Sequence, residues 1–208
     1  NGFRLHQRGA QAWFGVEADI CAYGKSIYGG LPLAAVAGKA KFMDAFDGGF
    51  WQFGDDSSPE GVITYFASTF IKNPISVAAA HAALSEIQRQ GEDLQVDLNE
   101  KTFRFASRIR EIFLRTKAPL MIQSASSFFM IKNADASPLT RLFNYFLRAR
   151  GVNIRERPCF LSTAHTEVDF EKTYRAFELA IQDMFEAGLL EKWEGEDLNV
   201  IVPPQSLE

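Results

Sequence analysis

Residues 21–32 read CAYGKSIYGGLP and place one lysine, Lys25, between a short apolar run and a glycine-rich bend. No Asp or Glu lies within five positions of Lys25 on either side, whereas surface lysines commonly have a carboxylate three or four positions away. We therefore expect this setting to desolvate the ammonium group and to lower its pKa. Only a free amine attacks an aldehyde, so the pattern is compatible with a Schiff-base lysine. The alternative is an ordinary lysine in a glycine-rich turn.

The segments around this loop predict strand, lysine loop and strand. Residues 20–23 and 33–38 are short apolar runs, and the first suits a buried strand. Lys25 then lies at a strand end, where α/β proteins place their sites. Residues 39–46 predict a short helix, and residues 47–61, rich in Gly, Asp, Ser and aromatics, predict an irregular loop.

Two long helices are expected next. Asn73-Pro74 begins the first, since proline suits the first helical turn, and Gly91 ends it. Its alanine-rich stretch, residues 77–84, needs close neighbours, so we expect this helix to be buried. Residues 93–117 form the second helix, with apolar residues at helical spacing.

The remaining chain alternates short strands with helices. Strands are expected at 126–132, 152–155 and 160–162, and an amphipathic helix at 139–150. A capping-box-like start at Thr166 begins a helix that runs to about residue 187. Residues 188–208 are polar, contain Pro203-Pro204 and are typical of a linker. The pattern divides the chain near residue 92.

Net charge and composition limit the partners, the cellular location and the metal sites that we expect for this protein. A net charge of −4 gives no electrostatic reason to expect nucleic-acid or anionic-membrane partners. No apolar stretch approaches the roughly 18 residues that span a bilayer. Cys21 and Cys159 lie far apart in apolar settings, which suits a reducing cytoplasm. Three scattered histidines predict no metal site, and His165, just before the cap Thr166, is expected to be structural.

Three segments in this order resemble the class III aminotransferases, the pyridoxal-phosphate (PLP) family that includes the glutamate-1-semialdehyde aminomutases. The first is GFR at residues 2–4 with GAQAWFGVEAD at 9–19, and the second is the lysine run, 24–32. The third is STFIKNP at residues 68–74. A fourth segment, FLSTAHTE at 160–167, resembles the C-terminal region of the aminomutases. Four ordered matches are more specific than one short motif.

The resemblance implies an α/β, fold type I PLP transferase that forms a homodimer with shared active sites. Residues 1–92 would be the C-terminal portion of the large PLP-binding domain, 93–187 the small α+β C-terminal domain, and 188–208 a tail or interdomain linker. The family's pyridinium-pairing Asp, phosphate-binding glycine loop and ring-stacking aromatic precede the segment that matches Asn1. We therefore expect this chain to be an incomplete portion of the enzyme.

The same resemblance implies roles for three residues. Lys25 would form the Schiff base with the cofactor aldehyde and would then carry the proton between the substrate carbon and the cofactor. Thr69 would bind the cofactor phosphate of the neighbouring subunit through its hydroxyl and backbone N–H, with Ser68 as an accessory donor. The alternative for Thr69 is a polar turn before the helix that starts at Asn73.

Two residues depart from the family pattern and are candidate substrate contacts. Tyr28 stands where the family more often has a small residue, and it could narrow the pocket or cover the turn. Arg157 lies where the aminomutases carry a glutamate close to the substrate. An arginine there could contact an anionic substrate group, or it could be a solvated side chain.

The predicted activity is transfer of an amino group from an amino-acid donor to a carbonyl acceptor. Residues 9–15 and 44–55 also look like the aminotransferase domains of hybrid polyketide–peptide synthetases. In that case the acceptor would be a carrier-bound β-ketoacyl chain and an acyl carrier protein would be a partner. The alternatives are a glutamate-1-semialdehyde 2,1-aminomutase, which moves the amino group within one molecule, and a non-catalytic dimerisation domain of the same fold.

Overall fold

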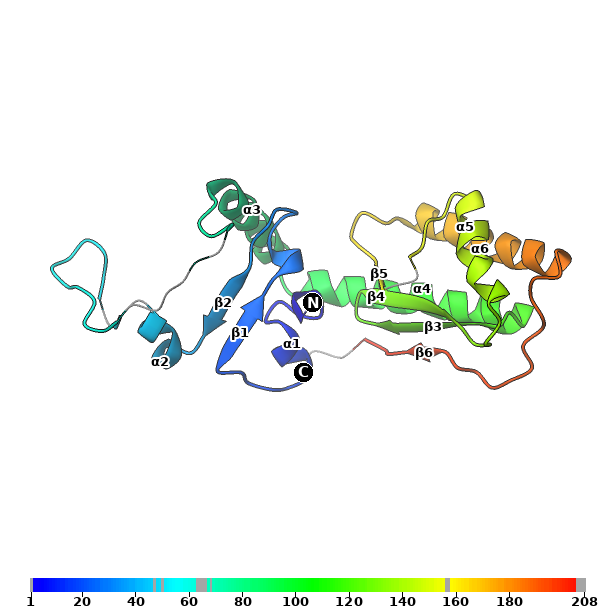
Figure 1. Ribbon diagram of the computed structural model, residues 1–208, viewed down its shortest axis with the longest axis horizontal. Coiled ribbons are helices and arrows are strands. Elements are labelled where there is room, and N and C mark those ends of the chain that lie inside the picture. The colour runs from blue at the N-terminus through cyan, green and yellow to red at the C-terminus, as the bar shows by residue number, and fades with distance from the viewer. Residues whose placement is uncertain are drawn as a thin grey trace. The chain divides into compact units, whose positions relative to one another are not determined.

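The computed structural model describes residues 2–46, 48–49, 51–62, 67, 69–155 and 158–204. The chain divides into two compact units, Asn1–Leu94 and Gln95–Glu208, which we call unit 1 and unit 2 (Figure 1). The boundary between the two units lies two residues after the division near residue 92 that the sequence pattern suggested. The assignment of the units to a large cofactor domain and a small domain stays a prediction.

Unit 1 contains a two-stranded antiparallel sheet. β1 (Ile20–Tyr23) pairs with β2 (Ala35–Gly38), with Cys21 opposite Ala37. The predicted order of strand, lysine loop and strand is therefore confirmed. The expectation of a buried first strand is wrong for this chain, because Ile20 and Ala22 are exposed and Cys21 and Tyr23 are only half-buried. A two-stranded sheet buries a strand only where other elements cover it.

Short helical segments surround this sheet. They are η1 (Gly2–Arg4), α1 (Ala10–Trp13), η2 (Lys25–Ile27), α2 (Ala40–Met43) and η3 (Asp44–Phe46). The last two confirm the short helix predicted at residues 39–46.

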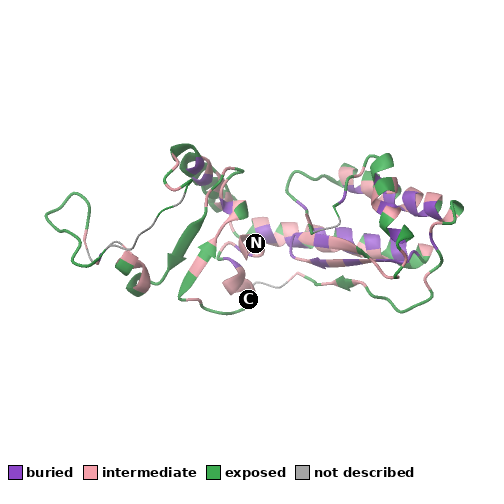
Figure 2. Ribbon diagram, viewed as in Figure 1, coloured by how far each residue is buried: buried purple, intermediate pink, exposed green. Residues whose placement is uncertain are grey.

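The long helix of unit 1, α3 (Pro74–Gln90), begins and ends where predicted. The Asn73 side-chain oxygen accepts hydrogen bonds from the backbone N–H groups of Ile75 and Ser76, at 3.1 and 3.0 Å. Gly91 ends the helix with a φ of 76°. The predicted burial is wrong, since Ser76 and Ala80 are the buried residues of α3 and most of its surface is exposed (Figure 2).

Unit 2 is built on a four-stranded sheet in the order β5 (Cys159–Phe160), β4 (Phe128–Asn133), β3 (Leu120–Ala125) and β6 (Val200–Ile201). β6 runs parallel to β3, and the other two pairs are antiparallel. The sequence did not predict β3. Its buried and half-buried residues alternate, but Met121 is apolar on the half-buried face and Ser124 is polar on the buried face, so the residue types do not alternate in the same way. The strand predicted at 152–155 is wrong, since those residues form no strand.

The helices of unit 2 supply most of its core. They are α4 (Asp93–Thr116), η4 (Leu139–Leu142), α5 (Phe143–Ala149) and α6 (Glu167–Glu186). The Phe105 ring of α4 lies 5.1 Å from Phe129 of β4 and 5.2 Å from Phe170 of α6. Phe105, Ile109 and Ile112 are buried at helical spacing, so one face of α4 closes the core.

The segment after Gly188 packs on unit 2, which its linker-like composition did not predict. The Trp193 backbone N–H donates to the Lys117 carbonyl at 2.8 Å. The Asn199 side-chain oxygen accepts from the Ile122 N–H at 2.7 Å, and β6 follows directly. Within the described residues, no helix combines the length and apolar character needed to cross a bilayer.

Candidate active site

Lys25 occupies a constrained turn at the end of β1. Gly24 is extended, with a φ of −160°, and Lys25 then takes a φ of 56° as the first residue of η2. The Tyr28 N–H donates to the Lys25 carbonyl at 3.3 Å and closes the turn. Positive φ is uncommon for residues other than glycine and is held only where the surroundings enforce it. The Lys25 backbone thus has a conformation that the surrounding turn must hold in place.

The burial of Ile27 and the close approach of Gly29 to α3 hold this turn in place. Ile27 is only 4% exposed and anchors η2 by burial. Gly29 has a φ of 57°, and a Cβ atom there would lie 2.8 Å from the Ala79 carbonyl oxygen. A side chain at position 29 would clash with the α3 backbone, so the glycine allows close approach.

The Lys25 side chain is exposed and makes no ion pair or hydrogen bond with the residues that the structure describes. Lys39 differs, since its ammonium lies 3.0 Å from Asp19 and 3.4 Å from Glu17. The hydrogen bond that the Lys39 ammonium donates to Asp19, and the charges of both carboxylates, raise the pKa of Lys39. The described part of this chain does not supply the desolvation expected for Lys25. The Lys25 amine has no ion-pair or hydrogen-bond partner among the described residues.

A cavity of about 200 Å³ lies beside β1 and reaches Gly24, the residue before Lys25. Its lining includes Gln11, Cys21 and Tyr23. The Gln11 side-chain oxygen accepts from the Ala18 N–H at 3.3 Å and from the Cys21 thiol at 3.5 Å. Burial, followed by the neighbouring Cys21, raises the pKa of Tyr23. Sequence reasoning missed these residues, and the signal was available because Cys21 and Tyr23 share one face of a strand.

Tyr28 is half-buried and lies over the lysine turn. A Cβ atom at Gly24 would be 3.9 Å from the edge of the Tyr28 ring. This contact is the geometry expected of a ring that covers the turn. A role for Tyr28 in substrate binding stays a prediction.

The structure describes only one of the two residues predicted to bind the cofactor phosphate. Ser68 lies outside the described residues. Thr69 is exposed in the turn before α3, where the Asn73 N–H donates to the Phe70 carbonyl at 3.3 Å. Thr69 therefore lies on a different loop from Lys25. Its role in binding the cofactor phosphate stays a prediction.

The other candidate residues lie in unit 2 or outside the described part. Arg157 belongs to the latter, so its predicted substrate contact stays open. His165 contacts Ser162, whose N–H and hydroxyl lie 3.1 and 3.0 Å from the His165 Nδ1 atom. The His165 ring also stacks on Phe170, which fits the structural role predicted for it. Across the described ranges, no three His, Cys, Asp or Glu residues are placed to hold a metal ion.

Comparison with known proteins gives the family. The model of the aminotransferase class-III family matches residues 8–162. Curated glutamate-1-semialdehyde 2,1-aminomutases from Alkaliphilus oremlandii and Nitrosopumilus maritimus are each 32% identical over 88% of this chain, which covers 42% and 44% of those proteins. The chain thus spans less than half the length of these relatives.

Solved structures agree on the fold. An omega-transaminase from Sphaerobacter thermophilus is 26% identical with a TM-score of 0.68, over 88% of this chain and 42% of that one. A transaminase solved with PLP bound is 22% identical with a TM-score of 0.70, over 90% of this chain and 43% of its own. The fold is the α/β fold of these transaminases, fold type I. The chain belongs to the class III aminotransferase family.

Proposed function

We propose that this chain is part of a PLP-dependent class III aminotransferase in which Lys25 is the residue that binds the cofactor. The observation that carries the proposal is the lysine turn. An exposed amine with no carboxylate partner among the described residues stands on a backbone held at positive φ by buried Ile27 and by the contact of Gly29 with α3. Membership of the family and the likeness to a transaminase with PLP bound support it.

The residues present fit this cofactor. When bound, PLP supplies an aldehyde that condenses with primary amines and an electron sink for the substrate carbanion. Lys25 would hold the aldehyde carbon and, once displaced by the incoming amine, would use its free Nζ atom to move a proton at the substrate carbon. A side chain without a competing carboxylate suits both tasks, since an ion pair would keep the ammonium charged.

Other residues have supporting roles in this proposal. Thr69, with Ser68, would donate hydrogen bonds to the cofactor phosphate of a partner subunit, since charge-assisted bonds to phosphate are strong. Tyr28 and Arg157 are the candidate substrate contacts. A homodimer would also cover exposed apolar side chains of α3 such as Ile75, which is 70% exposed. A reducing cytoplasm is the proposed location, where the free thiols of Cys21 and Cys159 would stay reduced.

The alternative activity is that of a glutamate-1-semialdehyde 2,1-aminomutase, and the names of the curated relatives favour it. The acceptor predicted from the resemblance to synthetase domains, a carrier-bound β-ketoacyl chain, has no support from the comparisons. Product analysis of the full-length protein separates the two activities. A transferase needs an external amino donor, whereas isomerisation of glutamate 1-semialdehyde without a donor would assign the aminomutase.

Borohydride reduction tests the role of Lys25. The full-length protein is incubated with PLP and reduced, and its peptides are then mapped by mass spectrometry. We expect a pyridoxyl group on Lys25, loss of this label in Lys25→Ala and retention in Lys39→Ala, whose lysine is paired with Asp19. A label on another lysine would remove Lys25 from this role. No label on any lysine would favour the non-catalytic dimerisation domain.

A further inference from the structure

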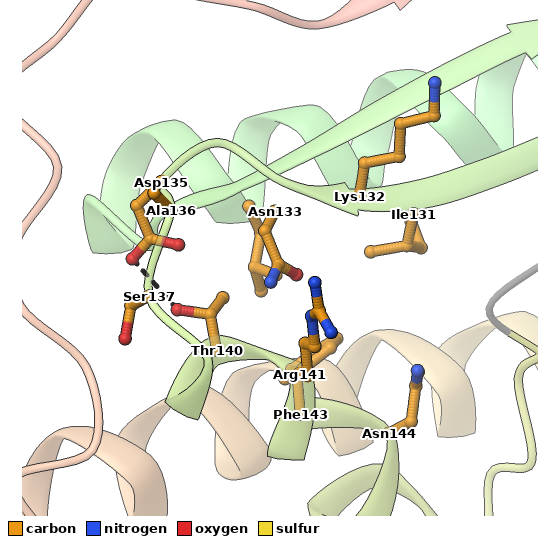
Figure 3. A pocket seen from close by; sticks show the side chains of 11 residues that line it. Ile131, Lys132, Asn133, Asp135, Ala136, Ser137, Thr140, Arg141, Phe143 and Asn144 are labelled. Atoms are coloured by element: carbon orange, nitrogen blue, oxygen red, sulfur yellow. Dashed lines mark hydrogen bonds between the residues drawn. The ribbon is translucent and has the colours of Figure 1, made fainter.

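One face of the unit 2 sheet, which we call the inner face, carries the hydrophobic core. Ile122 of β3 is fully buried there, and the Phe129 ring of β4 lies 5.1 Å from Phe105 of α4. Figure 3 shows the Ile131 side chain directed from the same face toward α5, whereas the Lys132 side chain is directed to the opposite side of β4. The helices of unit 2 therefore account for the burial of the inner face.

The opposite face of this sheet, which we call the outer face, is also mostly apolar. Gln123 of β3 is paired with Met130 of β4 and with Val200 of β6. Paired residues share a face, and so do residues two positions apart on one strand. The apolar residues of the outer face are therefore Met121, Ala125, Phe128, Met130, Phe160 and Val200. Gln123 and Lys132 are its polar residues.

The outer face is open to solvent. Val200 is 52% exposed and Phe160 is 38% exposed, and the other apolar residues of this face are half-buried. The rings of Phe128 and Phe160 lie 6.3 Å apart, so their exposed surfaces adjoin. In the described part of the chain, the strand residues that join the hydrophobic core, such as Ile131 and Ile201, belong to the inner face.

The residue types of the outer face are those of a covered surface. An antiparallel sheet with one face in water alternates apolar and polar residues along each strand. β4 instead begins with four consecutive apolar residues, 128–131, a run that is typical of a strand covered on both faces. Methionine, present here as Met121 and Met130, is common at surfaces that bind other polypeptide segments. We therefore expect a second layer on the outer face.

The size of the outer face favours a segment of the same polypeptide over a second copy of the chain. A stable interface between separate proteins takes roughly 20–30 residues from each side, far more than this face offers. A segment of the same polypeptide needs less area, because the connection keeps it at a high effective concentration. The chain spans less than half the length of its curated relatives, so a protein of their length has further polypeptide to supply such a segment.

We propose that, in the full-length protein, the outer face of unit 2 is covered by a segment of the same polypeptide from outside residues 1–208. The segment has an apolar face that packs on the apolar residues of the outer face. Lys132 stays at the rim, where its long side chain reaches water. The inference rests on the part of the proposed function that makes this chain a portion of a longer enzyme. It makes no use of Lys25 or of the cofactor.

Methionine oxidation tests this proposal. Met121 and Met130 lie on the outer face, whereas Met184 is fully buried in the core and serves as the internal control. The 208-residue chain and the full-length protein, both without added PLP, are treated with hydrogen peroxide, and mass spectrometry gives the oxidation rate of each methionine. In the 208-residue chain, we expect Met121 and Met130 to be oxidised at least tenfold faster than Met184. In the full-length protein, the three rates should agree within threefold.

The possible outcomes are distinct. Oxidation of Met121 and Met130 in the full-length protein that is as fast as in the 208-residue chain would overturn the proposal. Protection in the full-length protein that disappears on dilution would also overturn it, because a second copy would then be the covering partner. Oxidation of Met184 shows whether the 208-residue chain is folded; if it is not, the rates in the full-length protein decide. Borohydride labelling of Lys25 is a separate measurement, so failure of the proposed function is recognised independently.

A pair of matched variants of the full-length protein locates the covered surface. Val200→Asn changes the outer face, and Val168→Asn changes a valine of α6 that is 62% exposed. Val200→Asn should lower the midpoint of thermal unfolding by about 3 °C or more, because its amide would be buried in an apolar layer. It should also speed the oxidation of Met130, whereas Val168→Asn should leave both quantities unchanged. Equal results for the two variants would contradict a covering layer on the outer face.

Discussion

Gly29 and Ala79 lie in direct contact, with the position of a Gly29 Cβ atom only 2.8 Å from the Ala79 carbonyl oxygen. This contact joins the lysine turn to α3 across fifty positions of sequence. Gly29 also has a φ of 57°, a conformation that side chains strain. The geometry of Lys25 therefore depends on a helix that follows much later in the chain.

Gly29→Ala is expected to destabilise unit 1 by about 1–3 kcal/mol, because the added methyl group meets the α3 backbone. Gly15→Ala is the matched control, since Gly15 has a similar φ of 62° with nothing within 4 Å of a Cβ atom. Thermal unfolding measures both. Equal losses in the two variants would show that backbone strain alone, without the contact, accounts for the effect.

Phe177→Ala is expected to cost about 3–5 kcal/mol of unfolding free energy in unit 2. Phe177 is fully buried, with ring centroids of Phe113 and Phe143 at 5.9 and 5.3 Å. Phe53→Ala is the control, because Phe53 is 98% exposed and its removal should change stability by less than about 0.5 kcal/mol. Denaturant unfolding gives both values, and a small loss for Phe177→Ala would contradict the packing described for this core.

Asn199→Ala is expected to cost about 1–3 kcal/mol, because it leaves the Ile122 N–H of β3 without its acceptor. Gln182→Ala, which removes an exposed side-chain hydrogen bond within α6, should have little effect. Thermal unfolding followed by circular dichroism checks both. If residues 188–208 act only as a linker, Asn199→Ala will leave the midpoint of unfolding unchanged.

The stability provided by Asp169 is expected to depend on pH. Hydrogen bonds from the Thr166 backbone N–H and then from its hydroxyl lower the pKa of Asp169 below the ordinary value of 3.8. A carboxyl group with a lowered folded-state pKa stabilises the fold above 3.8, and this contribution disappears as the pH falls through the folded-state pKa. Wild type should therefore exceed Asp169→Asn in stability at neutral pH and match it in acid.

A double-mutant cycle supplies the control for this pH effect. In a Thr166→Ala background the hydroxyl bond is already absent, so Asp169→Asn should cost less there than in the wild type. Urea unfolding at several pH values measures the difference. A constant gap between wild type and Asp169→Asn at all pH values would show that the carboxylate charge is not the cause.

Signals that act over a few residues were readable from the sequence. Asn73-Pro74 and the pair Thr166 and Asp169 predicted the starts of α3 and α6, because a cap bonds to N–H groups two or three positions away. Gly91 likewise predicted a helix end, since glycine takes positive φ without strain. The order of strand, lysine loop and strand followed from two apolar runs and the bend between them.

Pairing between distant segments was not readable in this way. β3 has an apolar residue on its half-buried face and a serine on its buried face, so its alternation is visible only once the sheet is assembled. β6 pairs Val200 with Gln123, and a two-residue strand carries no periodic signal. A cavity of unit 2 that is lined by Ile131 of β4, Thr140 of η4 and Phe143 of α5 likewise exists only because these elements meet in the folded chain.

By itself, the sequence determined the family, the position of Lys25 after a strand, and the starts of the long helices, because these depend on residues close together in the chain. The tertiary structure decided that Gly29 sits against Ala79, that α3 is mostly exposed in this chain, and that the tail joins the sheet of unit 2. Those outcomes depend on contacts between segments tens of residues apart. The free energy of such contacts cannot be read from a local pattern of residue types.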